Sequence, residues 1–232
     1  MTSGWKLALT VAALICTADG AGMAACSDGP EAGVDWSNCE KTKVMLNGDD
    51  LKRANFNGAD ISRADLADAD LSGANLVEAT LTRTRLARAR LVGANLSKAM
   101  LERANLESAD LSDAVLVKTE LHRAILTNAN LSGANLEKAE FGRASLANAN
   151  LSGARLAQSY LARADLRNAK LSGADLSEAE LHLADLRGAD LSQVRGLVQA
   201  QLDEACGDST TRLPAGIALP STWPCATAGE DD

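Results

Sequence analysis

The chain has 232 residues, which is enough for one or two domains, and its formal net charge is −8. Its aromatic residues are three Trp, one Tyr and two Phe, so a core built from large rings is excluded. The core must instead consist of aliphatic side chains.

Residues 1–25 have the organisation of an export signal. Lys6 supplies a positive charge, residues 7–15 form an apolar run, and small residues follow as far as Ala25. The run is too short to span a membrane, and no other segment predicts a transmembrane helix. We predict cleavage between Ala18 and Ala25, which places the mature protein in the periplasm or outside the cell. A lipid anchor at Cys26 is the alternative.

Residues 26–45 follow the signal and precede a regular repeat. They contain Trp36 and the cysteines Cys26 and Cys39. An open end of a repeat structure exposes core side chains and unpaired backbone groups, which invite aggregation. We therefore predict that this segment is an N-terminal cap with Trp36 as its lid.

A five-residue repeat fills residues 46–195. Every fifth residue from Leu46 to Leu191 is large and apolar, and only Phe56, Ile61 and Phe141 are not Leu. The residue two positions earlier is Ala in nearly every unit, and Asn or Asp usually stands between them. The unit is therefore Ala-(Asn/Asp)-Leu-x-x.

The period of five fits neither a helix nor an ordinary strand. A straight α-helix would rotate the Leu stripe by about 140° per unit, and a strand requires alternation. Short extended segments with a corner every five residues keep Leu and Ala on the inside. Gly, Arg and Asn recur at every fourth unit after the apolar position, as at Gly73 and Gly93, so four units close one coil. A fixed short period predicts a solenoid of stacked coils.

On these residues the chain resembles the pentapeptide-repeat proteins. The resemblance covers residues 46–195 and implies an all-β fold, a right-handed quadrilateral β-helix with Leu and Ala facing inward. The flanking residues 34–39 and 200–208 are similar to the flanks of exported bacterial members. The best-known activity of the family, mimicry of duplex DNA at DNA gyrase, is a function that the resemblance implies as an alternative.

Residues 196–232 leave the five-residue register and predict a C-terminal cap and tail. Residues 198–205 predict one or two helical turns, and residues 210–225, which contain three prolines, predict an irregular closing loop. Trp223 is expected to cover this end of the core, as Trp36 covers the other.

Four cysteines lie outside the signal, two before the repeat and two after it, and four cysteines allow three pairings. Coils stacked ~4.8 Å apart hold the two ends roughly 35 Å apart, whereas a disulfide needs Cα atoms within about 7 Å. We therefore predict the pairs Cys26–Cys39 and Cys206–Cys225, one stapling each cap. An even number of cysteines confined to the caps favours an oxidising compartment.

The charge distribution argues against DNA mimicry. From Leu46 to Arg195 the chain has 20 acidic and 19 basic residues, so the repeat itself is close to neutral. A surface that imitates a phosphate backbone needs a strong negative field along its length. Export would also separate the protein from gyrase.

A column of arginines is the most specific surface feature that the repeat predicts. These arginines follow the apolar position by two and recur once per coil, and they are Arg63, Arg83, Arg103, Arg123, Arg143 and Arg163. Six guanidinium groups in line repel one another unless they are neutralised. Asp60, Glu102, Glu120 and Glu140 on the same side predict an interleaved ion-pair ladder. The alternative is an anion-binding or partner-binding strip, because Arg suits carboxylate and phosphate.

Other surface features have structural explanations. Asn128, Asn148 and Asn168, with Asn130 and Asn150 beside them, predict amide ladders along the stack. Met100 and Tyr160 replace the usual Asn or Asp on one side, three coils apart, and isolated apolar side chains on a surface need no functional explanation.

No catalytic constellation, metal site or cofactor motif is found in the sequence. His122 and His182 stand three coils apart, roughly 14 Å, which is too far to share a metal. A core filled by Leu and Ala leaves no concave pocket. We therefore predict no enzyme and no cofactor, but a rigid binding or structural module of the cell envelope. Its partner would be a protein or an anionic envelope polymer, with no nucleic acid. The alternatives are the gyrase-binding DNA mimic of the cytoplasm and self-association.

Overall fold

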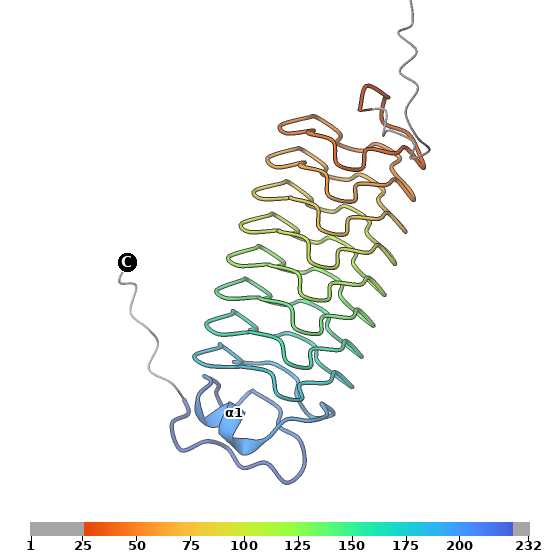
Figure 1. Ribbon diagram of the computed structural model, residues 1–232. Coiled ribbons are helices and arrows are strands. Elements are labelled where there is room, and N and C mark those ends of the chain that lie inside the picture. The colour runs from red at the N-terminus through yellow and green to blue at the C-terminus, as the bar shows by residue number, and fades with distance from the viewer. Residues whose placement is uncertain (1–25, 225–232) are drawn as a thin grey trace, which may run out of the picture.

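The computed structural model describes residues 26–224 as an elongated stack of coils (Figure 1). The helix of this region, α1, spans Gln199–Asp203 and lies at the C-terminal end of the stack. Within residues 26–224 the backbone forms isolated parallel bridges rather than longer strands. The predicted signal over residues 1–25 and Cys225 lie outside the described residues.

Each bridging residue pairs with the equivalent residue of the next coil, as Asn55 does with Asn75. Bridges recur at every fifth residue, so each coil has four sides. The predicted four-sided coil is confirmed. Coil geometry begins before the Leu repeat, because Asp35 already pairs with Asn55 within the segment expected to be a cap.

The backbone hydrogen bonds explain the preference for Asn or Asp before each apolar residue. In the unit centred on Leu51, the N–H groups of Leu51 and Arg53 donate to the next coil at 2.8 and 3.0 Å. The N–H group of Ala54 donates to the Leu51 carbonyl at 3.1 Å, and the N–H group of Asn55 donates to the previous coil at 2.8 Å. The N–H of Lys52 has no backbone acceptor and donates to Asp50 Oδ1 at 3.2 Å. The Asn or Asp side chain therefore caps the one N–H that the stack leaves over.

The same capping position carries the amide ladder. Asn150 Nδ2 donates to Asn130 Oδ1 at 3.0 Å, and Asn130 Nδ2 donates to Asp110 Oδ1 at 3.0 Å. The ladder predicted at Asn128, Asn148 and Asn168 does not form. These residues occupy turn positions, and their side chains make no hydrogen bond to another described residue.

The second turn residue of each unit is left-handed. Its φ lies between 55° and 76° in every unit from Gly33 to Gly188. Gly adopts this conformation without strain, whereas a side chain with Cβ adopts it at a cost. The six arginines of the predicted column all occupy this position, so each projects outward from the tip of a turn.

The core is one continuous column of Leu and Ala, as predicted. Three polar residues stand at Ala positions and are fully buried: Thr84, Thr119 and Ser159. The hydroxyls of Thr84 and Thr119 donate to core carbonyls at 2.9 and 2.7 Å. The Ser159 hydroxyl has no hydrogen-bond partner among the described residues.

Trp36 covers the N-terminal end of the core. It is 1% exposed and meets the Phe56 ring of the next coil edge to face, with 5.5 Å between centroids. Its Nε1–H donates to the Asp28 carbonyl at 3.2 Å. Lys41 Nζ lies 4.1 Å from the Trp36 ring centroid, so a cation covers the outer face of this lid.

The C-terminal end is covered by α1 and the loop after it. Leu202 of α1 is fully buried, and Trp223 is 7% exposed with its Nε1–H donating to the Ala205 carbonyl at 2.8 Å. Gln201 Nε2 donates to the carbonyls of Leu176 and Ala179 at 2.9 and 2.7 Å. The helix is shorter than the predicted 198–205, because Glu204 already caps its end.

The cysteines of the described residues lie in the two caps. Cys26 is disulfide-bonded to Cys39, with Cα atoms 5.6 Å apart. Cys206 is also disulfide-bonded, while its predicted partner Cys225 lies outside the described residues.

Candidate anion-binding edge

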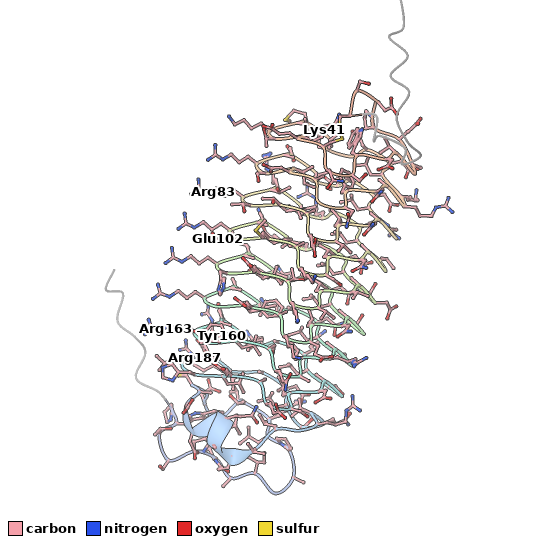
Figure 2. The ribbon with its side chains drawn as sticks, in the orientation of Figure 1. Lys41, Arg83, Glu102, Tyr160, Arg163 and Arg187 are labelled. Atoms are coloured by element: carbon pink, nitrogen blue, oxygen red, sulfur yellow. A yellow bond between two sulfur atoms is a disulfide. The ribbon has the colours of Figure 1, made fainter. Side chains whose placement is uncertain are left out.

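One edge of the stack carries a cation in seven consecutive coils. We call this surface the cation edge, and it consists of Lys43, Arg63, Arg83, Arg103, Arg123, Arg143 and Arg163. All seven residues are exposed, and Arg83 and Arg163 project from the same edge in Figure 2. Lys43 was missed by sequence reasoning because Lys41 replaces Leu in its unit. Lys43 could have been found from its position one coil before Arg63.

The predicted ion-pair ladder is absent from this edge. Among the described residues, the one ion pair to an edge cation joins Arg103 Nε to Glu102 Oε1 at 3.5 Å. Glu140 Oε2 instead contacts His122 Nε2 at 2.8 Å, and Asp60 accepts a bond from the Ser62 N–H at 2.9 Å. The predicted ladder was wrong because the carboxylates other than Glu102 meet other partners or solvent, and the guanidinium groups other than that of Arg103 remain uncompensated.

Basic residues on the other corners are neutralised more often. Arg85 contacts Asp65 at 2.8 Å, and Arg88 contacts Asp68 at 2.7 Å. The hydrogen bonds from Arg88 hold the pKa of Asp68 below its ordinary value. Charge on these corners is therefore compensated locally.

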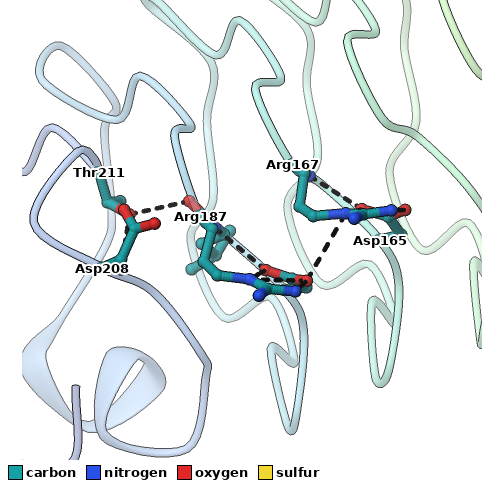
Figure 3. A network of polar contacts seen from close by, with 7 residues as sticks. Asp165, Arg167, Arg187, Asp208 and Thr211 are labelled. Atoms are coloured by element: carbon teal, nitrogen blue, oxygen red, sulfur yellow. Dashed lines mark hydrogen bonds and ion pairs between the residues drawn. The ribbon is translucent and has the colours of Figure 1, made fainter. Parts of the chain in front are cut away.

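The C-terminal coils provide the most connected example (Figure 3). Arg167 NH2 contacts Asp165 Oδ2 at 2.7 Å, and its Nε lies 3.7 Å from Asp185 Oδ2. Arg187 Nε donates to Asp185 Oδ1 at 2.9 Å. Burial raises the pKa of Asp165, but the bonds from Arg167 outweigh it and the pKa is lowered. These arginines are structural.

Backbone N–H groups without a capping side chain follow one another along the cation edge. The N–H groups of Thr82, Glu102, His122, Gly142 and Ala162 form no hydrogen bond to any described residue. The reason lies in the capping position, where this side has Thr80, Met100, Glu120, Glu140 and Tyr160. By contrast, Ser112, Ser132 and Ser152 donate to Asp110, Asn130 and Asn150 at 3.1, 3.3 and 3.2 Å. Cations and free N–H groups therefore coincide on one edge.

Two shallow grooves follow the cation edge. The first has a volume of about 500 Å³ and extends from Thr42 to Glu102 along Lys43, Arg63 and Arg83. The second has a volume of about 600 Å³ and continues from Glu102 past Arg123, Arg143 and Arg163. Both are open surfaces in which cationic donors outnumber the one carboxylate, that of Glu102, and they suit an extended anionic ligand.

The two histidines are each paired with a carboxylate. His122 contacts Glu140, and His182 Nδ1 lies 3.9 Å from Glu204. Over the described part of the chain, no cluster of three His, Cys, Asp or Glu side chains is arranged to hold a metal ion. In the same residues no helix has the length and apolar character to cross a membrane.

Comparison with solved structures finds several pentapeptide-repeat proteins. HetL, which is involved in heterocyst differentiation regulation in the cyanobacterium Nostoc sp. PCC 7120, is 31% identical with a TM-score of 0.57; the match covers 78% of this chain and 88% of HetL. A thylakoid-lumen protein from Arabidopsis thaliana is 22% identical, with a TM-score of 0.36 and coverage of 68% and 84%. Trypsin-treated QnrB1, a plasmid-mediated fluoroquinolone resistance protein, is 19% identical, with a TM-score of 0.40 and coverage of 78% and 92%.

A search of curated proteins finds no match. The sequence profile of pentapeptide repeats matches eight copies, over residues 50–87, 89–128, 124–161 and 159–195. This agrees with the four-sided coils and the Leu and Ala core, and the resemblance stated from the sequence is confirmed. The chain belongs to the pentapeptide-repeat family, whose members are right-handed quadrilateral β-helices.

Proposed function

We propose that the protein is a non-enzymatic, exported binding module of the cell envelope, and that the cation edge contacts its partner. The partner is an anionic envelope polymer that lies along the stack. Coils spaced ~4.8 Å apart offer one cation per step. The continuous Leu and Ala core makes the array rigid, so little conformational entropy is lost on binding.

One observation carries this proposal: unpaired guanidinium groups and uncapped N–H groups coincide through consecutive coils on one edge and not on the others. Each is a donor that favours carboxylate or phosphate oxygens. Charge on an exposed row without carboxylate partners also raises the repulsion between neighbouring coils. A bound polyanion would remove that repulsion.

The sign of this edge disfavours the alternative of DNA mimicry at gyrase. A mimic of duplex DNA presents negative charge, whereas this edge carries a cation in seven consecutive coils. Nothing on the described surface favours self-association over binding of an anion.

Export is tested by the intact mass of the protein from its native cells, with and without reduction. We expect a mass that lacks the signal, with the cut between Ala18 and Ala25. Four thiols should react only after reduction, from the proposed pairs Cys26–Cys39 and Cys206–Cys225. A full-length mass with free thiols would contradict export and return attention to gyrase.

Binding is tested with anionic polymer fractions of the native envelope. The variant R123Q/R143Q removes two charges from the cation edge. Lys118→Gln with Lys138→Gln removes the same charge at the same turn position on the neighbouring corner. We expect the first variant to lose most of the binding and the second to retain it. Equal loss in both would show that only net charge matters, and the edge would not be the binding surface.

A further inference from the structure

The second groove contains a feature that the first does not have. The first turn residue on this edge is Thr, Ser, Glu or His in most coils, but it is Gly142 and Ala162 in two consecutive coils. Both residues are buried by their neighbours. The part of the second groove that Tyr160 and the guanidinium groups of Arg143 and Arg163 line at these two residues is here called the notch.

An aromatic side chain forms one wall of the notch. Tyr160 is 40% exposed and meets His122 edge to face, with 6.4 Å between ring centroids. His122 is itself held by Glu140 at 2.8 Å. The Tyr160 hydroxyl forms no hydrogen bond to a described residue. Tyr160 therefore offers a positioned ring and a free hydroxyl.

Gly142 is needed for this arrangement. A Cβ at this position would lie 2.7 Å from His122 Nδ1 and 3.0 Å from Tyr160 Cε1. The backbone of Gly142 is not left-handed, so turn conformation does not require Gly here. Gly is required here because the His122 and Tyr160 rings lie too close for a Cβ.

Donors for an anion surround the notch. The guanidinium groups of Arg123, Arg143 and Arg163 have no carboxylate partner among the described residues. The N–H group of His122, which is half-buried and also lines the groove, is uncapped. Guanidinium groups bind carboxylates through two parallel hydrogen bonds, and a Tyr ring supplies an apolar face with a polar tip.

We propose that the notch binds a sugar acid unit of an acidic polysaccharide. The sugar ring lies on Tyr160, and its carboxylate is bound by Arg143 and Arg163. A polymer that consists of sugar acids throughout carries one carboxylate per sugar, so neighbouring units would meet neighbouring coils. This inference rests on the proposed function and deepens it, because it names the polymer class and the place of recognition.

A nucleic acid is a poorer occupant. Single-stranded nucleic acids are bound by several aromatic side chains on which successive bases stack, whereas Tyr160 is the one Phe, Tyr or Trp among the residues that line the two grooves. Duplex DNA carries a charge about every 1.7 Å, and the chain's net charge of −8 opposes so dense a polyanion. A sparsely charged polymer is repelled less.

The experiment uses the one tyrosine of the chain. Mature protein labelled with 3-fluorotyrosine gives a single ¹⁹F resonance, which is followed while hexagalacturonate is added. We expect a saturable shift. Gly142→Ala should displace the Tyr160 and His122 rings that form the wall of the notch and weaken binding about tenfold without changing charge, and R143Q/R163Q should weaken it by at least as much. Lys118→Gln with Lys138→Gln, on the neighbouring corner, should bind like the parent. Thermal melting checks that each variant folds.

Parallel titrations use the methyl ester of hexagalacturonate, poly-glutamate, polyphosphate and a single-stranded oligonucleotide. Little binding of the ester and weaker binding of the other three support the proposal. Tighter binding of any of the other three than of hexagalacturonate overturns it. If polyanions bind but Gly142→Ala has no effect, the notch is wrong and the cation edge stands. If no polyanion binds, the proposed function itself fails.

Discussion

The left-handed turn residue determines how side chains leave the coil. At Arg103 and Arg123 the φ values are 56° and 57°, a conformation that costs an L-residue roughly 1–2 kcal/mol. Gly occupies the same position in nine of the 32 units from Gly33 to Gly188, so the remaining 23 bear this cost. An edge of arginines at this position therefore reduces stability and projects cations, which is consistent with a binding role.

The backbone cost can be measured at two glycines. A Cβ at Gly93 would meet nothing within 4 Å, whereas one at Gly196 would lie 2.8 Å from Ser177 Cα. We expect Gly93→Ala to lower the free energy of unfolding by about 1 kcal/mol, and Gly196→Ala to lower it further. Urea denaturation measures both. Equal values would contradict the geometry.

Ser159 predicts a stabilising substitution. Its buried hydroxyl lacks a partner among the described residues, while Thr119 at an equivalent core position donates to the Leu96 carbonyl at 2.7 Å. Ser159→Ala should raise the free energy of unfolding by about 1 kcal/mol, and Thr119→Val should lower it by a similar amount. The same denaturation measurement checks both, and the two changes in free energy should have opposite signs.

At the scale of the turn, the capping aspartates predict sensitivity to acid. Hydrogen bonds from Ser177 and Ser192 lower the pKa of Asp175 and Asp190 below the ordinary value of 3.8. A lowered folded-state pKa stabilises the fold above the unfolded value, and this stabilisation is lost as the pH falls through the folded value. We expect the melting temperature to fall below about pH 4.

The matched control is D175N/D190N. Asn at the same position still accepts the turn hydrogen bond, as Asn95 does from the Ser97 N–H at 3.1 Å, but it does not titrate. In acid, the melting temperature of the variant should fall less than that of the parent. Identical acid profiles would mean that the caps do not cause the effect.

The N-terminal lid predicts both stability and association state. Trp36→Ala removes a buried ring from the end of the core and should cost about 3–5 kcal/mol. It also uncovers Phe56, so light scattering should detect end-to-end association. Met45, which is 70% exposed, provides the control Met45→Ala. A monomeric Trp36→Ala protein with parental stability would show that Trp36 is not a lid.

The four-sided coil could be predicted from the sequence because Leu and Ala recur with the period at which residues are buried. The ion pairs could not be predicted, because Glu140 lies in the arginine register and yet contacts His122. That choice depends on side-chain conformations that a period does not specify. Met100 and Tyr160 stand where most units have Asn or Asp, and this was visible in the sequence. The hydrogen-bond pattern was needed to show that such a replacement leaves a turn N–H group without an acceptor.

At the scale of the whole molecule, the repeat is nearly neutral, but its charge is distributed unevenly over the surface. The carboxylates of the stack are largely used by turn caps and by ion pairs such as Arg85–Asp65 and Arg88–Asp68. In most of its coils the cation edge has neither a carboxylate that caps the turn nor an ion pair. Long-range attraction to a polyanion is therefore weak, and we expect affinity to depend on contact along the edge and to fall with salt.

Amide hydrogen exchange with and without hexagalacturonate tests the cation edge most directly. In the free protein we expect fast exchange at Thr82, Glu102 and His122, and slow exchange at the capped amides of Ser132 and Ser152. Added hexagalacturonate should slow exchange at the first set and leave the second unchanged. Equal protection of both sets in the free protein, or no change on the edge at saturating ligand, would contradict the account.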